Sequence, residues 1–251
     1  MNKKTNEKKK KKIRFKGLLI VILFVYLVLS CVYYLWTRPI KYVNIEGNVY
    51  LKESYISDYL SLEDTSIMKI NKKDVVEKLI LHPLISDASV KKVGNKLNIV
   101  ITEEKILFYN LNKQKLVLSN GEECDNESIL GIPSLINYVP LDIYTEFIEK
   151  LTVVDDEVLS IISEIEYNPS IVNGKTVDEK RFLLRMNDGN TVYINTINIE
   201  KINNYLSIIE AVLNKSDIKK GCLYLDSIST NNHFDNCKTD MKESDIVGSE
   251  N

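Results

Sequence analysis

The side chains that could support catalysis are few in this chain of 251 residues, and they lie far apart. Acid–base catalysis needs two groups that face one reacting atom. Glu103 and Glu104 follow a predicted strand, where neighbouring side chains point to opposite faces, so they do not serve one atom. His82 ends a predicted helix, where a cationic ring suits the helix dipole, and His233 lies in a polar C-terminal stretch. We predict no catalytic residues.

Phosphate, metal and disulfide chemistry have little support in the sequence. The nine glycines are scattered, without a phosphate-binding loop or a G-x-S-x-G turn. Two distant histidines do not predict a metal site, so we expect no metal and no cofactor. Four cysteines are too few for a disulfide-rich fold. A disulfide between Cys222 and Cys237 stays an open alternative. The odd number of cysteines after residue 36 argues against a disulfide framework, and Cys222 also suits a small core position.

The charges of the chain are divided into two groups. Lys and Arg total 33, and Asp and Glu total 35, for a formal net charge of −2. Residues 1–16 hold eight Lys, Arg14 and the single acid Glu7, which gives +8, and the rest of the chain carries −10. A Lys run can indicate a nucleic-acid patch. The apolar segment that follows the Lys run favours a role at the membrane over a nucleic-acid patch.

Residues 17–36 contain no charged side chain and predict a transmembrane helix. Twenty residues at 1.5 Å per residue span about 30 Å, the hydrocarbon thickness of a bilayer. Basic residues before the helix place the N-terminus in the cytoplasm and everything after Thr37 outside, and the Lys run then serves orientation and contact with anionic lipids. The run is too long for a cleaved signal peptide, and residues 28–31 match a lipoprotein cleavage box poorly.

Residues 37–105 alternate strand and helix signals in the order β-α-α-β-β. The second helix begins at Asn71, an N-cap residue type, and stops before Pro83. The turn pair Gly94-Asn95 joins two strands, and apolar residues alternate with polar ones in the second of these strands. The predicted elements are a strand over 40–45, a helix over 51–60, a helix from 71, and a hairpin over 85–93 and 96–102.

Residues 106–228 predict a β-rich domain with helices, so the fold class is α+β. Two short helices are expected within 141–163, and a later helix that ends near Gly221. From 229 to 251 the chain is polar, which predicts a flexible tail. The later helix is expected to bury Ile202, Tyr205, Leu206, Ile209, Val212 and Leu213. Strands are expected over 106–111, 115–118, 164–167, 181–186, 191–194 and 222–228.

The last predicted strand carries the candidate binding site. An extracytoplasmic chain without catalytic groups suits a binding or assembly role. If the strand forms a sheet edge, its free N–H and C=O groups would pair with a strand of another chain. If it is internal, no such role follows, and the pattern favours neither reading. The candidate partner-binding residues are Leu223, Tyr224, Leu225, Asp226, Ser227 and Ile228.

Several segments resemble the bacterial cell-division family FtsQ, called DivIB in Gram-positive bacteria. Ile40-x-x-Val43-x-Ile45-x-Gly47-Asn48 is similar to the first strand and turn of the family's POTRA domain. His82-Pro83-Leu84-Ile85-x-x-Ala88-x-Val90 and Lys96-Leu97-x-Ile99-x-Ile101-x-Glu103 resemble its hairpin. Residues 187–194 and Leu223-Tyr224-Leu225-Asp226 occur in family order.

The chain departs from the family pattern at three places. Many relatives carry Arg and then Pro after the acidic position, where this chain has Glu104-Lys105-Ile106. Many have Pro in the turn where Gly94-Asn95 stands, and Gly near Asn195. These differences weaken the match of single motifs more than the order of the domains.

The resemblance implies a non-catalytic scaffold of the division machinery in the plasma membrane, enriched at the septum. Its parts would be a cytoplasmic tail (1–16), a transmembrane helix (17–36), a POTRA domain (37–105), a β domain (106–228) and a tail (229–251). FtsL-like and FtsB/DivIC-like coiled-coil proteins would be its partners, without nucleic acid or a small-molecule substrate. A partner strand would add to Leu223–Ile228, with Leu223, Leu225 and Ser227 supplying specificity.

Two other function classes stay open. One is another POTRA-bearing module, for secretion or sporulation. The other is a membrane-anchored cell-wall enzyme that uses His82, His233, Glu103 or Glu104.

Overall fold

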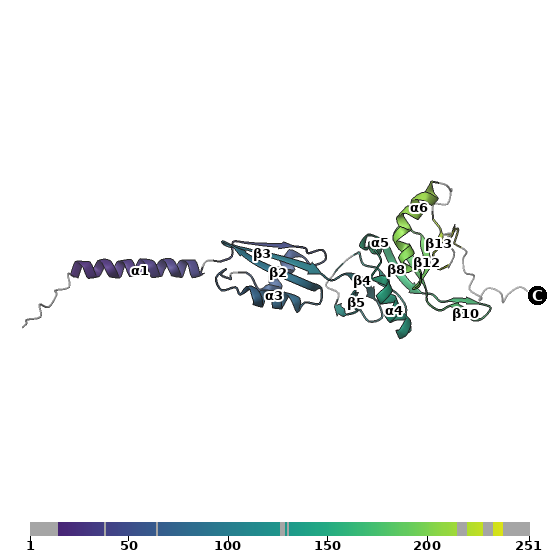
Figure 1. Cartoon of the computed structure of the whole chain (residues 1–251), viewed down its shortest axis with the longest axis horizontal. Coiled ribbons are helices and arrows are strands. Elements are labelled where there is room, and N and C mark those ends of the chain that lie inside the picture. Colours follow the sequence, from purple (N-terminus) through teal and green to yellow (C-terminus); the bar gives the residue numbers. More distant parts are fainter. Residues whose placement is uncertain are drawn as a thin grey trace, which may run out of the picture. The chain divides into compact units, whose positions relative to one another are not determined.

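The computed structural model describes residues 15–37, 39–63, 65–125, 129, 131–214, 220–227 and 233–237. Contacts divide the chain into two compact units, one ending at Thr102 and the other beginning at Glu103. We call them the N-terminal unit and the β unit and describe each by itself (Figure 1).

The N-terminal unit begins with helix α1 (Phe15–Thr37), which is apolar almost throughout. By length and composition it is able to cross a membrane, and its apolar stretch is not covered by other described parts of the chain. The helix predicted over 17–36 is therefore observed. The Lys-rich run before it lies almost entirely outside the described residues.

The rest of the N-terminal unit confirms the predicted order β-α-α-β-β. A three-stranded sheet has the order β1-β3-β2, with β1 parallel to β3. Leu97, Ile99 and Ile101 alternate along β3 and are buried, as are Ile56 of α2 and Leu79 of α3. The elements are β1 (Tyr42–Glu46), α2 (Glu53–Leu60), α3 (Lys72–Ile80), β2 (Ile85–Val93) and β3 (Lys96–Glu103).

Helix α3 begins as its sequence predicts. The Asn71 side chain accepts a hydrogen bond from the Lys73 backbone N–H (3.1 Å), which satisfies one of the donors that every helix leaves open at its start. The helix ends at Ile80, which is exposed because it lies about 100° around the helix from the buried Leu79.

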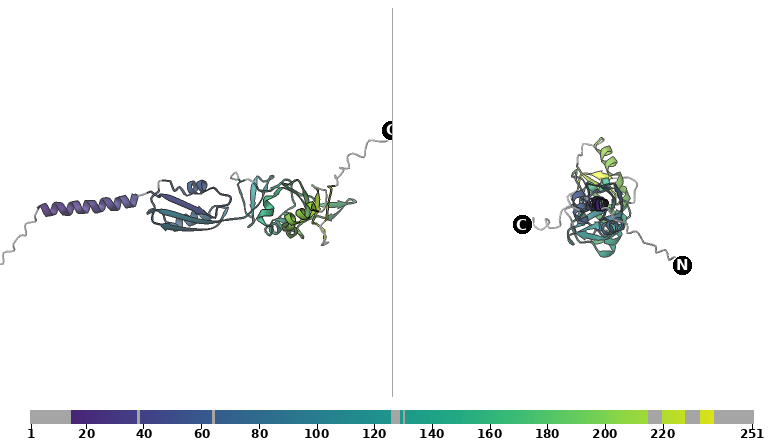
Figure 2. Two further views of the ribbon diagram at one scale, coloured as in Figure 1. Left: turned by 90° about the horizontal axis from the view of Figure 1, so that it is seen from above. Right: turned by 90° about the vertical axis from the view of Figure 1, so that its left-hand side faces the viewer.

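The β unit contains a nine-stranded sheet among its described residues, in the order β14-β13-β12-β11-β8-β7-β4-β5-β6. Six strands confirm the sequence prediction: β4 (Ile106–Asn110), β5 (Lys115–Leu118), β8 (Ile162–Tyr167), β11 (Arg181–Met186), β12 (Thr191–Asn195) and β13 (Cys222–Tyr224). Five were missed: β6 (Glu123–Asp125), β7 (Ser134–Leu135), β9 (Ser170–Val172), β10 (Lys175–Asp178) and β14 (His233–Asp235). Strands β9 and β10 form a separate hairpin that projects from the unit (Figures 1 and 2).

Helices pack on one face of this sheet and enclose its core. Helices α4 (Leu141–Leu151) and α5 (Asp156–Ser160) confirm the two short helices that the sequence predicts. The core contains Phe147 of α4, whose ring stacks on Phe182 of β11 with the ring centres 3.9 Å apart.

The later helix differs from its prediction. It consists of a 3₁₀ segment, η1 (Ile199–Asn204), followed by α6 (Tyr205–Leu213), and so ends well before Gly221. Of its predicted stripe, Ile202, Tyr205 and Ile209 are buried and Val212 is half-buried, whereas Leu206 and Leu213 are exposed. A 3₁₀ segment turns every three residues, so the buried stripe shifts around the helix at the junction.

Candidate functional site

The candidate partner-binding strand is internal in the described sheet. Strand β13 pairs in parallel with β12 on one side and antiparallel with β14 on the other. Of the two readings that the sequence leaves open, the internal position is therefore the one observed for Cys222–Tyr224, because β14 pairs with the other side of β13. Leu225, Asp226 and Ser227 continue beyond β13, and Ile228 lies outside the described residues.

The two faces of β13 have different surroundings. Leu223 of β13, and Leu225 just after the strand, are fully buried in the main core. They cannot supply specificity toward a partner, which corrects the sequence-based expectation for both residues. Tyr224 points to the opposite face, where its ring stacks on Tyr193 (4.9 Å between centres) and contacts the His233 ring (5.8 Å).

The backbone directions show which groups of β13 face outward. The Leu225 N–H donates to the Tyr193 carbonyl (2.8 Å), and the Gly221 carbonyl accepts from the Thr191 N–H (3.0 Å). Both bonds lead to β12. Because successive residues of a strand alternate in direction, the backbone groups of Cys222 and Tyr224 face β14. These are the groups that a partner strand would need.

A disulfide between Cys222 and Cys237 fastens β14 to β13, with 4.9 Å between the two Cα atoms. It settles the pairing that the sequence leaves open, and Cys222 is more than a small core residue. Residues 233–237 are also part of the folded unit, so the predicted flexible tail is wrong for this segment.

The segment after β13 is held by side chains of other elements. Asn195 donates to the Asp226 carbonyl (3.0 Å), and Lys201 Nζ donates to the Ser227 carbonyl (2.8 Å). Asn198 lies within 3.4 Å of both carbonyls. This part of the candidate site is therefore positioned by β12 and η1.

Asp226 is the ionisable group of the candidate site with a shifted pKa. Burial raises the pKa of its carboxyl group, and the Arg181 guanidinium, 3.9 Å away, offsets only part of that rise. A raised pKa in the folded state stabilises the fold below the ordinary Asp value of 3.8, and this contribution is lost as the pH rises through the folded value.

Replacing Asp226 with asparagine is expected to remove this pH dependence. The stability of the wild type minus that of Asp226→Asn should fall as the pH rises from about 3 and then level off. Urea unfolding of the full chain in detergent micelles, followed by circular dichroism, measures it. The two proteins must be compared because other groups also make stability depend on pH. Hydrogen bonds from Lys180 and Thr196 lower the pKa of Glu146, so the contribution of Glu146 to stability rises with pH. Subtracting the variant from the wild type cancels that contribution. A flat or rising difference would contradict the assignment.

Two of the four residues considered for catalysis, His82 and Glu104, make hydrogen bonds within the fold. His82 is buried, and its Nδ1 accepts a hydrogen bond from the Leu84 N–H (3.2 Å), so the ring is part of the packed fold. Glu104 accepts a hydrogen bond from Ser119 Oγ (2.6 Å), and His233 lies exposed on β14. Among the described residues, no three His, Cys, Asp or Glu side chains gather as a metal site.

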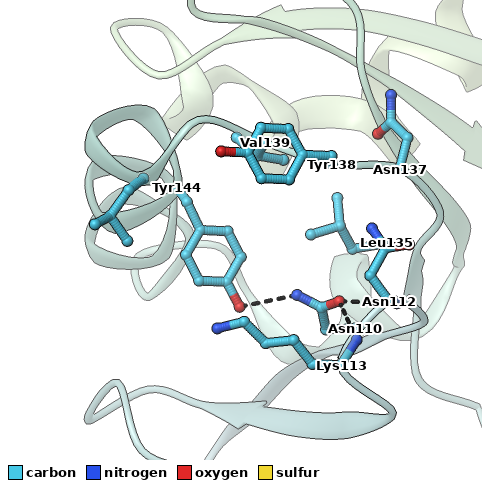
Figure 3. Close-up of a pocket in the computed structure, with 9 residues that line it drawn as sticks. Asn110, Asn112, Lys113, Leu135, Asn137, Tyr138, Val139 and Tyr144 are labelled. Carbon is cyan, nitrogen blue, oxygen red and sulfur yellow. Dashed lines mark hydrogen bonds between the residues drawn. The ribbon is translucent and has the colours of Figure 1, made fainter.

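A pocket of about 190 Å³ lies elsewhere in the β unit, between the end of β4 and the start of α4 (Figure 3). Its polar groups bond internally: Asn110 donates to the Tyr144 hydroxyl (3.1 Å), and Lys113 pairs with Glu123 (2.6 Å). Tyr138 and Leu141 leave an exposed apolar wall. The pocket suits an apolar group, and no sequence pattern predicted it because its residues come from separate elements.

Comparison with known proteins covers both units. Residues 38–104 match the family of the POTRA domain, FtsQ-type. The chain is 32% identical over 137 residues to the cell division protein DivIB of Clostridium botulinum (strain Hall), covering 49% of this chain and 53% of that protein. It is 28% identical over 196 residues to DivIB of Geobacillus kaustophilus, covering 74% and 73%.

Similar solved structures include the major extracytoplasmic domain of DivIB from Geobacillus stearothermophilus, with 24% identity and a TM-score of 0.35, covering 46% of this chain and 99% of that one. The match to the Clostridium botulinum relatives spans about half of their length.

Proposed function

Because this chain belongs to the FtsQ/DivIB family of cell-division proteins, we propose that it is a membrane-anchored, non-catalytic scaffold that recruits and stabilises other division proteins at the septum. The observation that carries the proposal is the FtsQ-type POTRA match at 38–104, which starts one residue after a helix able to cross a membrane. The Lys-rich N-terminus would stay in the cytoplasm and contact anionic lipids.

The β unit would hold FtsL-like and FtsB/DivIC-like coiled-coil partners through the β13–β14 end of its sheet. Strand addition there supplies main-chain hydrogen bonds, and outward side chains supply specificity. With Leu223 and Leu225 buried, the described candidate side chains that remain for contact are the half-buried Tyr224 and Asp226 and the exposed Ser227.

Localisation tests this function. A fluorescent fusion of the full chain should form a band at midcell in dividing cells, and it should restore division when the native protein is depleted. An even distribution around the membrane would overturn the division role and favour another POTRA-bearing module.

The enzyme alternative has its own test. The triple variant Glu103→Gln, Glu104→Gln, His233→Asn should restore division as well as the wild type does. His82 is left unchanged because it is part of the fold. Loss of division with normal protein levels would contradict the non-catalytic role.

A further inference from the structure

We propose that β14 is a built-in occupant of the β13 edge, and that the Cys222–Cys237 disulfide controls whether another chain can add a strand there. The biological meaning of this control rests on the proposed docking function of the β unit. The control itself is a property of this chain and can be measured without any partner.

Strand β14 uses the groups that an incoming strand would need. Its register pairs Asp235 with Cys222 and His233 with Tyr224, the two residues of β13 whose backbone groups face away from β12. A partner strand and β14 therefore exclude each other at these positions. In the described sheet β14 is the terminal strand, so release of β14 makes β13 the edge.

Apart from the disulfide, few contacts hold β14. It has three residues, of which only Phe234 packs against the main core, and that side chain is half-buried. Its close fit depends on Gly221, where a Cβ atom would lie 2.5 Å from the Asp235 carbonyl oxygen and 2.8 Å from the Phe234 ring. A strand this short gains little from burial, so the covalent bond that closes a loop with a sequence separation of 15 should dominate its retention.

The disulfide can be reached from solvent. Cys222 is buried in a small cluster with Leu183 and Tyr193, on the face opposite the main core, whereas Cys237 is exposed. A thiolate of an external dithiol would attack Sγ of Cys237, and Cys222 would leave as a thiolate and take a proton. The second thiol of the reductant then resolves the mixed disulfide. Two electrons and two protons pass to the cysteines, and the dithiol becomes a disulfide.

Hydrogen exchange of the full chain in detergent micelles tests the release. With dithiothreitol, the amides of Cys222 and Tyr224 should exchange at least about tenfold faster than without it. Amides of β11 and the N-terminal unit should keep their rates. Unchanged exchange at Cys222 and Tyr224 would overturn the proposal. An equal increase across β11 would also overturn it, because the whole unit would then be unfolding.

Two variants separate the disulfide from other effects of the reductant. Cys237→Ser removes the bond at an exposed position, so it should show fast exchange at Cys222 and Tyr224 without dithiothreitol and no further change with it. Gly221→Ala keeps the bond but places a methyl group against β14, and should accelerate exchange at the same two amides. Slow exchange in Cys237→Ser would contradict the role of the disulfide.

Partner binding then tests the consequence. A purified DivIC-like extracytoplasmic segment should bind the Cys237→Ser chain at least about tenfold more tightly than the oxidised wild type. Equal affinity would overturn the control of docking even if β14 is released. Failure of the proposed function would instead appear as an even distribution of the wild-type fusion around the membrane, and Cys237→Ser should leave the midcell band in place.

Discussion

Replacing Gly47 with alanine is expected to destabilise the POTRA domain by about 2–5 kcal/mol. Gly47 follows β1 with φ of +86°, a left-handed conformation that costs an alanine about 1–2 kcal/mol. A Cβ atom at this position would lie 2.0 Å from the carbonyl oxygen of Ile101 in β3. Since that neighbour is backbone, β1 and β3 must move apart, which adds about 1–3 kcal/mol.

Gly94→Ala is the matched control for this prediction. Gly94 also has a positive φ, +61°, but a Cβ atom there would meet nothing within 4 Å. It should cost only the conformational part, about 1–2 kcal/mol. Hydrogen exchange of β3 amides in the full chain measures both variants. Equal losses of stability in Gly47→Ala and Gly94→Ala would contradict the prediction, because the contact with the Ile101 carbonyl would then be relieved at little cost.

The POTRA domain was the more predictable part because its signals are local. In β3, Leu97, Ile99 and Ile101 alternate with more exposed residues because one face is buried and the other meets water. Gly94-Asn95 marks the turn. Asn71 marks the helix start, because its side chain accepts a hydrogen bond from the backbone N–H of Lys73, only two residues later. Each of these features depends on neighbours in the sequence, so one sequence is enough to read it.

The missed strands depend on distant contacts or have no buried face. In the β9–β10 hairpin Ile171, Val172 and Val177 are all exposed, so no alternation arises. Strand β14 reads His233-Phe234-Asp235, which is largely polar, and joins the sheet through Phe234 and the disulfide. The one signal for it in the sequence was the pair of cysteines.

The sheet edge could not be predicted for the same reason. A strand pattern shows which residues are apolar, and it correctly placed a strand at Cys222–Tyr224. Whether that strand is internal depends on where a later segment pairs, and here the later segment is β14, which the Cys222–Cys237 disulfide joins to β13. Sequence reasoning therefore located the strand at Cys222–Tyr224 but not the strand that pairs with it.

Replacing Phe147 with alanine is expected to destabilise the β unit by about 3–5 kcal/mol. The side chain is fully buried on α4, stacks on Phe182 with the ring centres 3.9 Å apart, and lies 6.1 Å from the Phe108 ring. Alanine would remove the ring that fills the space between α4 and the sheet. A typical domain is stable by only about 5–15 kcal/mol, so the loss would leave the unit marginal.

Leu141→Ala is the control on the same helix. Leu141 is 75% exposed, and its replacement should change stability by less than about 0.5 kcal/mol. Hydrogen exchange should show faster opening of β11 and β12 in Phe147→Ala, while amides of the POTRA domain keep their rates because each unit has its own core. Capture of the coiled-coil partners should fall with Phe147→Ala and persist with Leu141→Ala. Equal acceleration in both units would mean that they unfold together, and undiminished capture by the destabilised chain would place partner binding outside the β unit.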